Sequence, residues 1–205
     1  MNKMTRGLFI VVSAPSGAGK TSICREFLRA CPQVNFSVSY TTRKPRSIEV
    51  EGKDYFFVSR EEFQRRVAEN AFIEWTENYG NYYGTSVKVV EETLALGNDL
   101  LLDVEPGGAR NLKKSVKGGV FVFILPPSKE DLLNRLRKRG CETENDISRR
   151  LARAEEELKE VSWYDYIIFN SELATAAEQL KSIYLAEKCR RTRLAGKIKQ
   201  FMKNN

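Results

Sequence analysis

The sequence has no histidine and only four cysteines among its 205 residues. Without histidine, the chain cannot form a mixed Cys/His zinc site, and it cannot use a Ser–His or Cys–His pair for nucleophilic catalysis. The cysteines do not form a CxxC pair; they are Cys24, Cys31, Cys141 and Cys189. We therefore expect free thiols in a reducing compartment and no zinc site.

Long apolar runs are also missing. No stretch approaches the roughly 18 apolar residues that would cross a bilayer. The run 8–12 follows Lys3 and Arg6, but it is too short for the core of a signal peptide, and no cleavage site follows it. We expect a cytoplasmic protein without membrane contact. Its 41% hydrophobic residues suffice for the core of one domain.

The basic charge is concentrated at one end of the chain. The net charge is +7, and residues 188–205 contain seven basic and no acidic residues, so residues 1–187 carry no net charge. A neutral body does not indicate a nucleic-acid surface, and we expect no nucleic acid as a partner. For 188–205 we favour an amphipathic helix that packs on its own domain. A dimer contact, or a weak nucleic-acid or membrane contact, remains as an alternative, so a monomer and a homo-oligomer both stay open.

Apolar runs alternate with helical patterns along most of the chain. Continuous apolar runs predict strands buried on both faces, at 8–12, 99–104, 120–125 and 166–169. Helical patterns cover 21–30, 86–96, 128–139, 147–161 and 173–193. This alternation predicts an α/β fold with three layers and a central parallel sheet.

Two segments interrupt this alternation. Residues 36–85 alternate with period two, are rich in aromatics and include one helical pattern at 60–70, which predicts a small mixed α+β insertion. Residues 140–146 are polar and separate two helices, which predicts a lid loop within a lid of about 139–150. The core domain would then comprise 6–35 and 86–187.

The segment SAPSGAGKT (13–21) lies between a predicted strand and a predicted helix. Gly17 and Gly19 permit backbone angles that direct successive N–H groups at an anion, and the helix start adds positive charge. Lys20 can reach the β- and γ-phosphates of a nucleotide, and the Thr21 hydroxyl suits Mg²⁺. Ala14 stands where this pattern usually has glycine, which fits if its φ is negative. The alternative is a glycine-rich turn without a ligand.

The insertion carries polar groups that suit a second ligand. Arg43 and Arg46 lie three apart beside hydroxyl side chains, and arginine pairs well with phosphate; a solvated basic edge is the alternative. Other polar groups stand among apolar neighbours: Tyr55, Glu74, Tyr83 and Thr85. Most of the aromatics are expected only to pack the insertion: Phe56, Phe57, Phe72 and Trp75.

At these motifs the sequence resembles guanylate kinases. The matching strings are SVSYTTRKPR (37–46), EGKDYFFVS (51–59), FIEW (72–75), GNYYGTS (80–86) and RLRKRG with RRL (135–140 and 149–151). The resemblance covers about residues 6–187. It departs from the family at Glu105, where aspartate is frequent, and at Pro106-Gly107, where an aromatic or Met followed by Gln is frequent.

The resemblance implies roles for individual residues. Glu74 would accept hydrogen bonds from guanine N1–H and the amino group, Thr85 would address O6, and Asp103 would sit near GMP and the waters of Mg²⁺. The residues implied at the GMP phosphate are Ser39, Arg43, Arg46, Tyr55 and Tyr83. Those implied at ATP are Ala14, Pro15, Ser16, Gly17, Ala18, Gly19, Lys20, Thr21 and, at the adenine, Asn170.

The lid region supplies further arginines. The resemblance implies that Arg135, Arg139 and Arg150 close over the transferring phosphoryl group, while Arg43 neutralises charge on the acceptor phosphate. An ordinary basic helix surface is the alternative, and it is preferred for the neighbouring residues Arg137, Lys138 and Arg149.

The function that the resemblance implies is Mg²⁺-dependent transfer of a phosphoryl group from ATP to GMP, and also to dGMP, in line and without a covalent intermediate. A GMP phosphate is anionic at neutral pH and needs no general base, so the lack of histidine is no obstacle. Two alternatives remain. One is a non-catalytic guanylate-kinase-like binding module, against which the intact Gly17, Gly19, Lys20 and Thr21 argue. The other is a different nucleoside monophosphate kinase, against which Glu74 with Thr85 argues.

Overall fold

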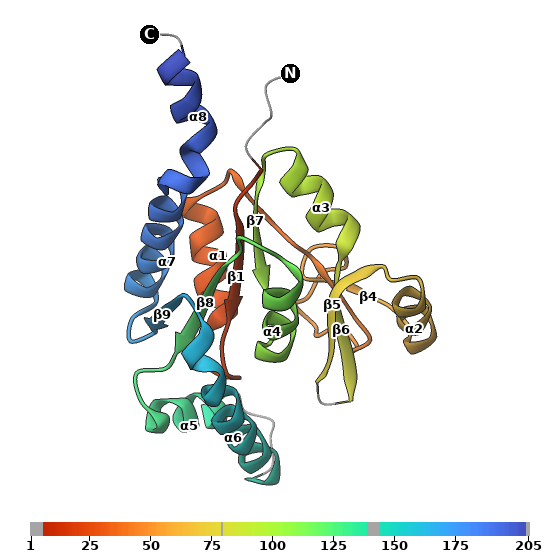
Figure 1. Ribbon diagram of the computed structural model, residues 1–205. Coiled ribbons are helices and arrows are strands. Elements are labelled where there is room, and N and C mark those ends of the chain that lie inside the picture. Colours follow the sequence, from red (N-terminus) through yellow and green to blue (C-terminus); the bar gives the residue numbers. More distant parts are fainter. Residues whose placement is uncertain (1–5, 79, 139–143, 204–205) are drawn as a thin grey trace.

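A parallel sheet forms the centre of the molecule. The computed structural model describes residues 6–78, 80–138 and 144–203. Across these ranges, five strands form an all-parallel sheet in the order β2-β7-β1-β8-β9 (Figure 1). They are β1 (Phe9–Ser13), β2 (Val34–Phe36), β7 (Asp99–Asp103), β8 (Val120–Leu125) and β9 (Tyr166–Phe169). The predicted α/β fold with a central parallel sheet is confirmed.

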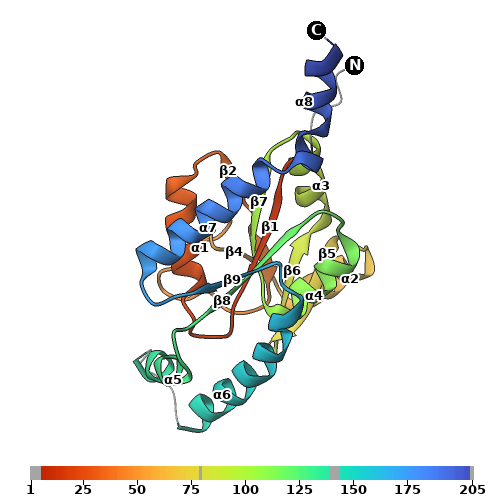
Figure 2. The same cartoon turned by 60° about the vertical axis from the view of Figure 1, so that its left-hand side comes forward.

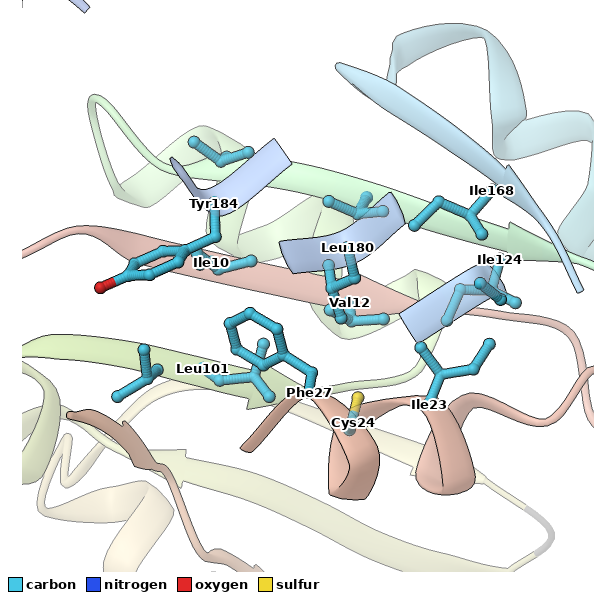
Figure 3. Close-up of a cluster of buried hydrophobic side chains, with 14 of the residues drawn as sticks. Ile10, Val12, Ile23, Cys24, Phe27, Leu101, Ile124, Ile168, Leu180 and Tyr184 are labelled. Atoms are coloured by element: carbon cyan, nitrogen blue, oxygen red, sulfur yellow. The ribbon is translucent and has the colours of Figure 1, made fainter. Parts of the chain in front are cut away.

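One face of this sheet is covered by α1 (Lys20–Ala30) and α7 (Leu173–Lys188). Alternate side chains of the segment through β1, including Ile10 and Val12, point to this face and pack with residues of both helices (Figure 3). Phe27 of α1 meets Tyr184 of α7 edge to face, with ring centroids 5.7 Å apart. This packing places α1, and the loop before it, firmly against the sheet.

The opposite face is covered by α3 (Val87–Ala95), α4 (Pro106–Ser115) and a 3₁₀ helix, η1 (Lys159–Trp163). Phe9 and Val11 point to this side, so β1 is buried on both faces. This explains why its sequence is continuously apolar rather than alternating. The result is a three-layer arrangement around β1.

A second, mixed sheet lies beside the core, with strand order β4-β3-β6-β5 (Figure 1). It consists of β3 (Ser39–Thr41), β4 (Tyr55–Phe57), β5 (Phe72–Asn78) and β6 (Asn81–Ser86), with α2 (Arg60–Ala68) packed on it. The Ser59 hydroxyl caps α2 by accepting from the Glu62 N–H. Phe63 of α2 stacks on Phe72 and anchors the helix to the sheet. This small sheet also contacts α4 through β5.

Two elements were absent from the sequence-based predictions. Helix α4 begins with Pro106, Gly107 and Gly108, which read as a turn, yet proline is well tolerated in the first helical turn and Ala109 and Leu112 are fully buried. Strand β2 pairs with β7 in the central sheet and ends at Phe36, a residue that the sequence analysis placed in the insertion. Its three residues are too few for a periodicity to be recognised.

The lid region is largely helical. Helix α5 (Lys129–Lys138) and helix α6 (Glu144–Leu158) lie at one end of the molecule (Figure 1). The predicted lid loop at 140–146 was therefore wrong for 144–146, which belong to α6. The remainder of that loop, with Arg139, lies outside the described residues. Leu132 and Leu136 of α5 pack with Ala154 of α6, which joins the two helices.

The last predicted helix is interrupted. Helix α7 ends at Lys188, and a separate helix, α8 (Arg191–Lys203), projects away from the body (Figures 1 and 2). No residue of α8 is buried, and Phe201 and Met202 are 67% and 70% exposed. The expectation that this helix packs on its own domain was therefore wrong beyond its first turn. Within the described ranges, none of the helices is both long enough and apolar enough to cross a membrane.

Candidate nucleotide-binding site

The loop between β1 and α1 has the conformation that its glycines predict. Gly17 and Gly19 both have φ of 94°, in the left-handed region that favours glycine. Among the described residues, Asn70 is the only non-glycine with positive φ, so Ala14 keeps a negative φ and fits without strain. The loop lies at the carboxyl edge of the parallel sheet, where ligands bind in open α/β folds.

Two polar side chains support this loop through hydrogen bonds to the Ala18 carbonyl. The Asn170 side-chain amide donates to the Ala18 carbonyl at 2.7 Å. Arg135 donates to the same carbonyl at 3.3 Å and to the Asn170 carbonyl at 2.8 Å. A Cβ atom on Gly19 would lie 2.3 Å from Asn170 Nδ2, so a larger residue could not occupy that position without displacing the amide. In this structure, the Asn170 amide thus supports the loop.

Lys20 points to the end of β7. Its Nζ lies 2.6 Å from Asp103 Oδ1 and 3.4 Å from Glu105 Oε1, and it donates to the Val104 carbonyl at 2.9 Å. Burial alone would lower the pKa of Lys20, but the charges of Asp103 and Glu105 outweigh it and raise that pKa. The lysine is therefore a fixed cation beside the loop.

A cleft of about 290 Å³ opens in front of the loop. Its walls come from the loop and the start of α1, from the small sheet, from the end of β7 and from α6. The lining residues are Ala14, Pro15, Ser16, Gly17, Gly19, Lys20, Thr21, Ser22, Arg43, Arg46, Tyr55, Asn78, Asn81, Tyr83, Asp103, Glu105, Arg150 and Glu157.

A narrow recess adjoins this cleft and shares Tyr55, Tyr83, Asp103 and Glu105 with it. Glu74 lines the recess and is only 6% exposed. The Thr85 hydroxyl donates to Glu74 Oε1 at 2.6 Å. Burial raises the pKa of Glu74 to about 7, although the bond from Thr85 opposes the shift. The recess therefore presents one acidic group that titrates near neutrality.

The loop between β3 and β4 of the small sheet places two arginines, Arg43 and Arg46, at the cleft. Arg43 pairs with both carboxylate oxygens of Glu49, at 3.0 and 2.8 Å, and its guanidinium lies 5.4 Å from the centre of the Tyr55 ring. Arg46 Nη1 lies 3.8 Å from Glu49. The Glu49 carboxylate thus occupies a bidentate position that a phosphate could also take.

Helix α6 contributes Arg150 and Glu157 to the cleft. Glu157 is 8% exposed, and Arg153 donates to its Oε1 at 3.0 Å. Its Oε2 has no hydrogen-bond partner within the described part of the chain, and burial raises the pKa of this carboxyl group.

Comparison with known proteins identifies the family. A family model described as Guanylate kinase matches residues 6–187. The chain belongs to the guanylate kinase family. The guanylate kinase of Syntrophus aciditrophicus is 54% identical over 201 residues, which cover 97% of each chain. That of Geobacter sulfurreducens is 50% identical over 195 residues, covering 95% of this chain and 96% of the relative.

A solved structure agrees. The crystal structure of guanylate kinase from Anaplasma phagocytophilum matches with a TM-score of 0.78 at 32% identity, covering 94% of this chain and 92% of that one. The family resemblance of the sequence is thereby confirmed. The guanylate kinase match includes both the loop and the small sheet, whereas α8 lies outside residues 6–187.

Most of the site residues predicted for this guanylate kinase family member meet at the cleft or its recess. Ser39 and Glu74 line the recess, and Thr85 lies behind Glu74. Ala18, Arg135 and Asn170 are not among the lining residues; Arg135 and Asn170 instead support the loop by donating to the Ala18 carbonyl. Arg139 lies outside the described residues.

The sequence analysis missed several polar residues of the site. Glu157 lies seven residues after Arg150, which is two helical turns and the same face of α6, so its spacing offered a signal. The position of Glu49 in the sequence gave no such signal, because its contact with Arg43 depends on how the loop between them folds. Asn78 and Asn81 also line the cleft, at the ends of β5 and β6.

Proposed function

We propose that this protein transfers the terminal phosphoryl group of ATP to GMP, and also to dGMP, giving ADP and the nucleoside diphosphate. The observation that carries the proposal is the connection of two sites. The loop between β1 and α1 (13–21), here called the phosphate loop, lines the cleft, and the recess of Glu74 adjoins that cleft. Asp103 and Glu105 line both the cleft and the recess. A donor and an acceptor nucleotide can therefore meet with their phosphates between them.

The recess suits guanine. As a carboxylate, Glu74 accepts two hydrogen bonds, and guanine presents N1–H and an amino group side by side. Adenine lacks this pair of donors, so it would leave the buried carboxylate unpaired, at a cost of about 1–3 kcal/mol or more for a charged group. Thr85 donates to Glu74 and so orients it. A contact with guanine O6 would require the Thr85 hydroxyl to rotate away from that bond.

The acceptor phosphate would bind at the small sheet. Arg43 and Arg46 provide charge, and the hydroxyls of Ser39, Tyr55 and Tyr83 provide further donors. Arg43 would exchange the carboxylate of Glu49 for phosphate, keeping its bidentate geometry. After the exchange, the half-buried guanidinium of Arg43 would again be paired with an anion.

Transfer requires positioning and charge neutralisation rather than a proton acceptor. The acceptor phosphate is already anionic, so it can attack in line without a covalent intermediate. Lys20 would leave its ion pair with Asp103 and pair with the transferring phosphoryl group. Arg150 and Arg139 would close over that group from the lid. Arg135 would keep the loop in place from behind.

The donor set fits Mg²⁺. Thr21, Asp103 and Glu105 all line the cleft, and hydroxyl and carboxylate oxygens are ligands that Mg²⁺ prefers. Among the described residues, no group of three or more His, Cys, Asp or Glu side chains is arranged to hold a metal ion. The bound ion would neutralise charge on the phosphates of ATP.

A substrate panel tests the proposal. With ATP as donor, we expect turnover of GMP and dGMP and little of AMP, UMP or dTMP. Lys20→Ala should lower kcat by at least about a hundredfold, since one group that stabilises transition-state charge is worth that much. Lys88→Ala, on the exposed surface of α3, is the matched control. Turnover of no acceptor would favour a binding module, and preference for AMP would favour a different nucleoside monophosphate kinase.

A further inference from the structure

Two adjacent glycines lie in the first turn of α4, and only one of them is packed tightly against the Glu74 side chain. Gly108 is buried, and a Cβ atom built on it would lie 2.4 Å from Glu74 Oε2 and 3.2 Å from Glu74 Cδ. Gly107 is exposed, and a Cβ atom there would meet nothing closer than Thr76 Oγ1 at 3.5 Å, an ordinary contact. The two positions thus differ sharply in what a methyl group would displace.

We propose that Gly108 is a specificity-determining positioning residue. Its lack of a side chain allows the Glu74 carboxylate to lie against the first turn of α4, where it can read guanine. The inference rests on the proposed role of Glu74. It assigns to the start of α4 a part in base selection that neither the phosphate loop nor the small sheet supplies.

The carboxylate is held from two sides. Thr85, on β6, donates to Oε1 at 2.6 Å, and Gly108, on α4, leaves room for Oε2. The first turn of a helix also carries partial positive charge, which favours an anion beside it. The position of the carboxylate therefore depends on two elements, on β6 for the bond to Oε1 and on α4 for the space that Oε2 occupies.

A methyl group at residue 108 would move Glu74 rather than α4. The helix is anchored by Ala109 and Leu112, which are fully buried in the core. The atom displaced is the far end of the Glu74 side chain, and the nearest other neighbour, Val104 Cβ, would stand at an ordinary 3.7 Å. Alanine also forms helices better than glycine. The variant should therefore fold, while its carboxylate is shifted and its bond to Thr85 broken.

The test compares Gly108→Ala with Gly107→Ala in steady-state assays. For Gly108→Ala we expect the KM for GMP to rise about tenfold to a hundredfold, as for loss of a hydrogen bond to a charged group, with the KM for ATP within about twofold and a cooperative thermal unfolding transition that shows a folded protein. Gly107→Ala should change none of these by more than about twofold. Discrimination between GMP and IMP, which lacks the amino group, should fall in Gly108→Ala only.

A double-mutant cycle separates this inference from the proposed role of Glu74. In a Glu74→Ala background, adding Gly108→Ala should leave the KM for GMP unchanged, because the group that Gly108 positions is gone. An equal rise in both backgrounds, or no rise in Gly108→Ala alone, would overturn the role of Gly108. If Glu74→Ala itself left GMP binding unchanged, the proposed function of Glu74 would fail instead.

Discussion

Glu74 combines deep burial with an ionisable group, and this makes its protonation part of its function. Burial raises its pKa to about 7, so a measurable fraction is protonated at neutral pH. A protonated carboxyl group carries a hydrogen of its own and can no longer accept two hydrogen bonds from one base. Recognition of guanine should therefore depend on pH within the physiological range.

We predict that the KM for GMP rises as the pH falls below about 7, by at most about tenfold per unit. Glu74→Gln should bind GMP about tenfold to a hundredfold more weakly at alkaline pH, and its pH profile should lack this component. The comparison is made by measuring KM across pH for both proteins, since titration of the GMP phosphate affects them equally. Parallel profiles would exclude Glu74 as the titrating group.

Single residues differ in how far their roles could be predicted. Gly17 and Gly19 were predictable because the spacing of the loop demands left-handed angles, which both adopt. Gly108 was not, because nothing local distinguishes it from Gly107. Its contact with Glu74 spans 34 positions of the chain and exists only after α4 packs beside β5.

At the scale of secondary structure, α6 presents neighbouring arginines in different environments. Arg150 lines the cleft, whereas Arg149 is exposed on the surface of the helix. We predict that Arg150→Ala lowers kcat by at least about a hundredfold, because an arginine that neutralises the transferring group stabilises the transition state. GMP binding should survive, as measured by equilibrium titration. Arg149→Ala is the matched control, and equal rates for the two variants would remove Arg150 from the mechanism.

Asp99, the first residue of β7, links this strand to Leu8, the residue before β1, and to helix α7. Asp99 is 4% exposed and accepts from the Leu8 N–H at 2.6 Å, the Tyr184 hydroxyl at 2.8 Å and Lys188 Nζ at 2.7 Å. Burial alone would raise the pKa of Asp99, but Lys188 and the other two donors outweigh it and lower that pKa. The folded protein therefore favours the charged carboxylate.

We predict that Asp99→Ala reduces the free energy of unfolding by roughly 3–5 kcal/mol near neutral pH, because it leaves buried donors unpaired. Since the pKa is lowered on folding, this stabilisation is present above the ordinary value of 3.8 and is lost as the pH falls through the folded value. Urea unfolding at neutral and acid pH measures it. If the difference in free energy of unfolding between the parent protein and Asp99→Ala stayed constant into strong acid, the stabilising role of the Asp99 carboxylate would be contradicted.

The predicted strands were accurate where apolar runs were continuous, as in β8 and β9, whose bounds match the prediction. The expected burial on both faces holds for β8 but was wrong for β9, an edge strand in which Ile167 and Phe169 are 38% and 57% exposed. Helix α4 was missed because Pro106, Gly107 and Gly108 have low helix propensity, and the packing of Ala109 and Leu112 overrides that propensity. Helix propensity therefore gave the wrong prediction at a place where tertiary contacts determine the secondary structure.

At the scale of the whole molecule, α8 stands apart from the site. It projects from the body on the side away from α5 and α6, and none of its residues is buried (Figure 1). Near its start, Arg193 donates a hydrogen bond to the Arg6 carbonyl at 3.2 Å. The helix therefore contributes little to the packing that holds the cleft.

We predict that deleting residues 191–205 changes the free energy of unfolding by less than about 1 kcal/mol and leaves kcat for GMP unchanged. Deleting residues 188–205 is the matched comparison, because it also removes Lys188, the partner of Asp99, and should destabilise the protein clearly. Thermal unfolding and turnover of both truncated proteins test this. A large loss of stability in the shorter deletion would show that α8 supports the body.

The sequence by itself determined the parallel α/β core, the phosphate loop and the family, because buried strands and phosphate loops depend on residues that are adjacent in the chain. The tertiary structure alone decided that Glu49 pairs with Arg43, that Gly108 makes room for Glu74 and that α8 leaves the body. The pair of Arg43 and Glu49, six residues apart, depends on how the loop between them folds, and the other two features depend on distances between segments far apart in sequence. Such distances follow from how the elements pack, which no local pattern encodes.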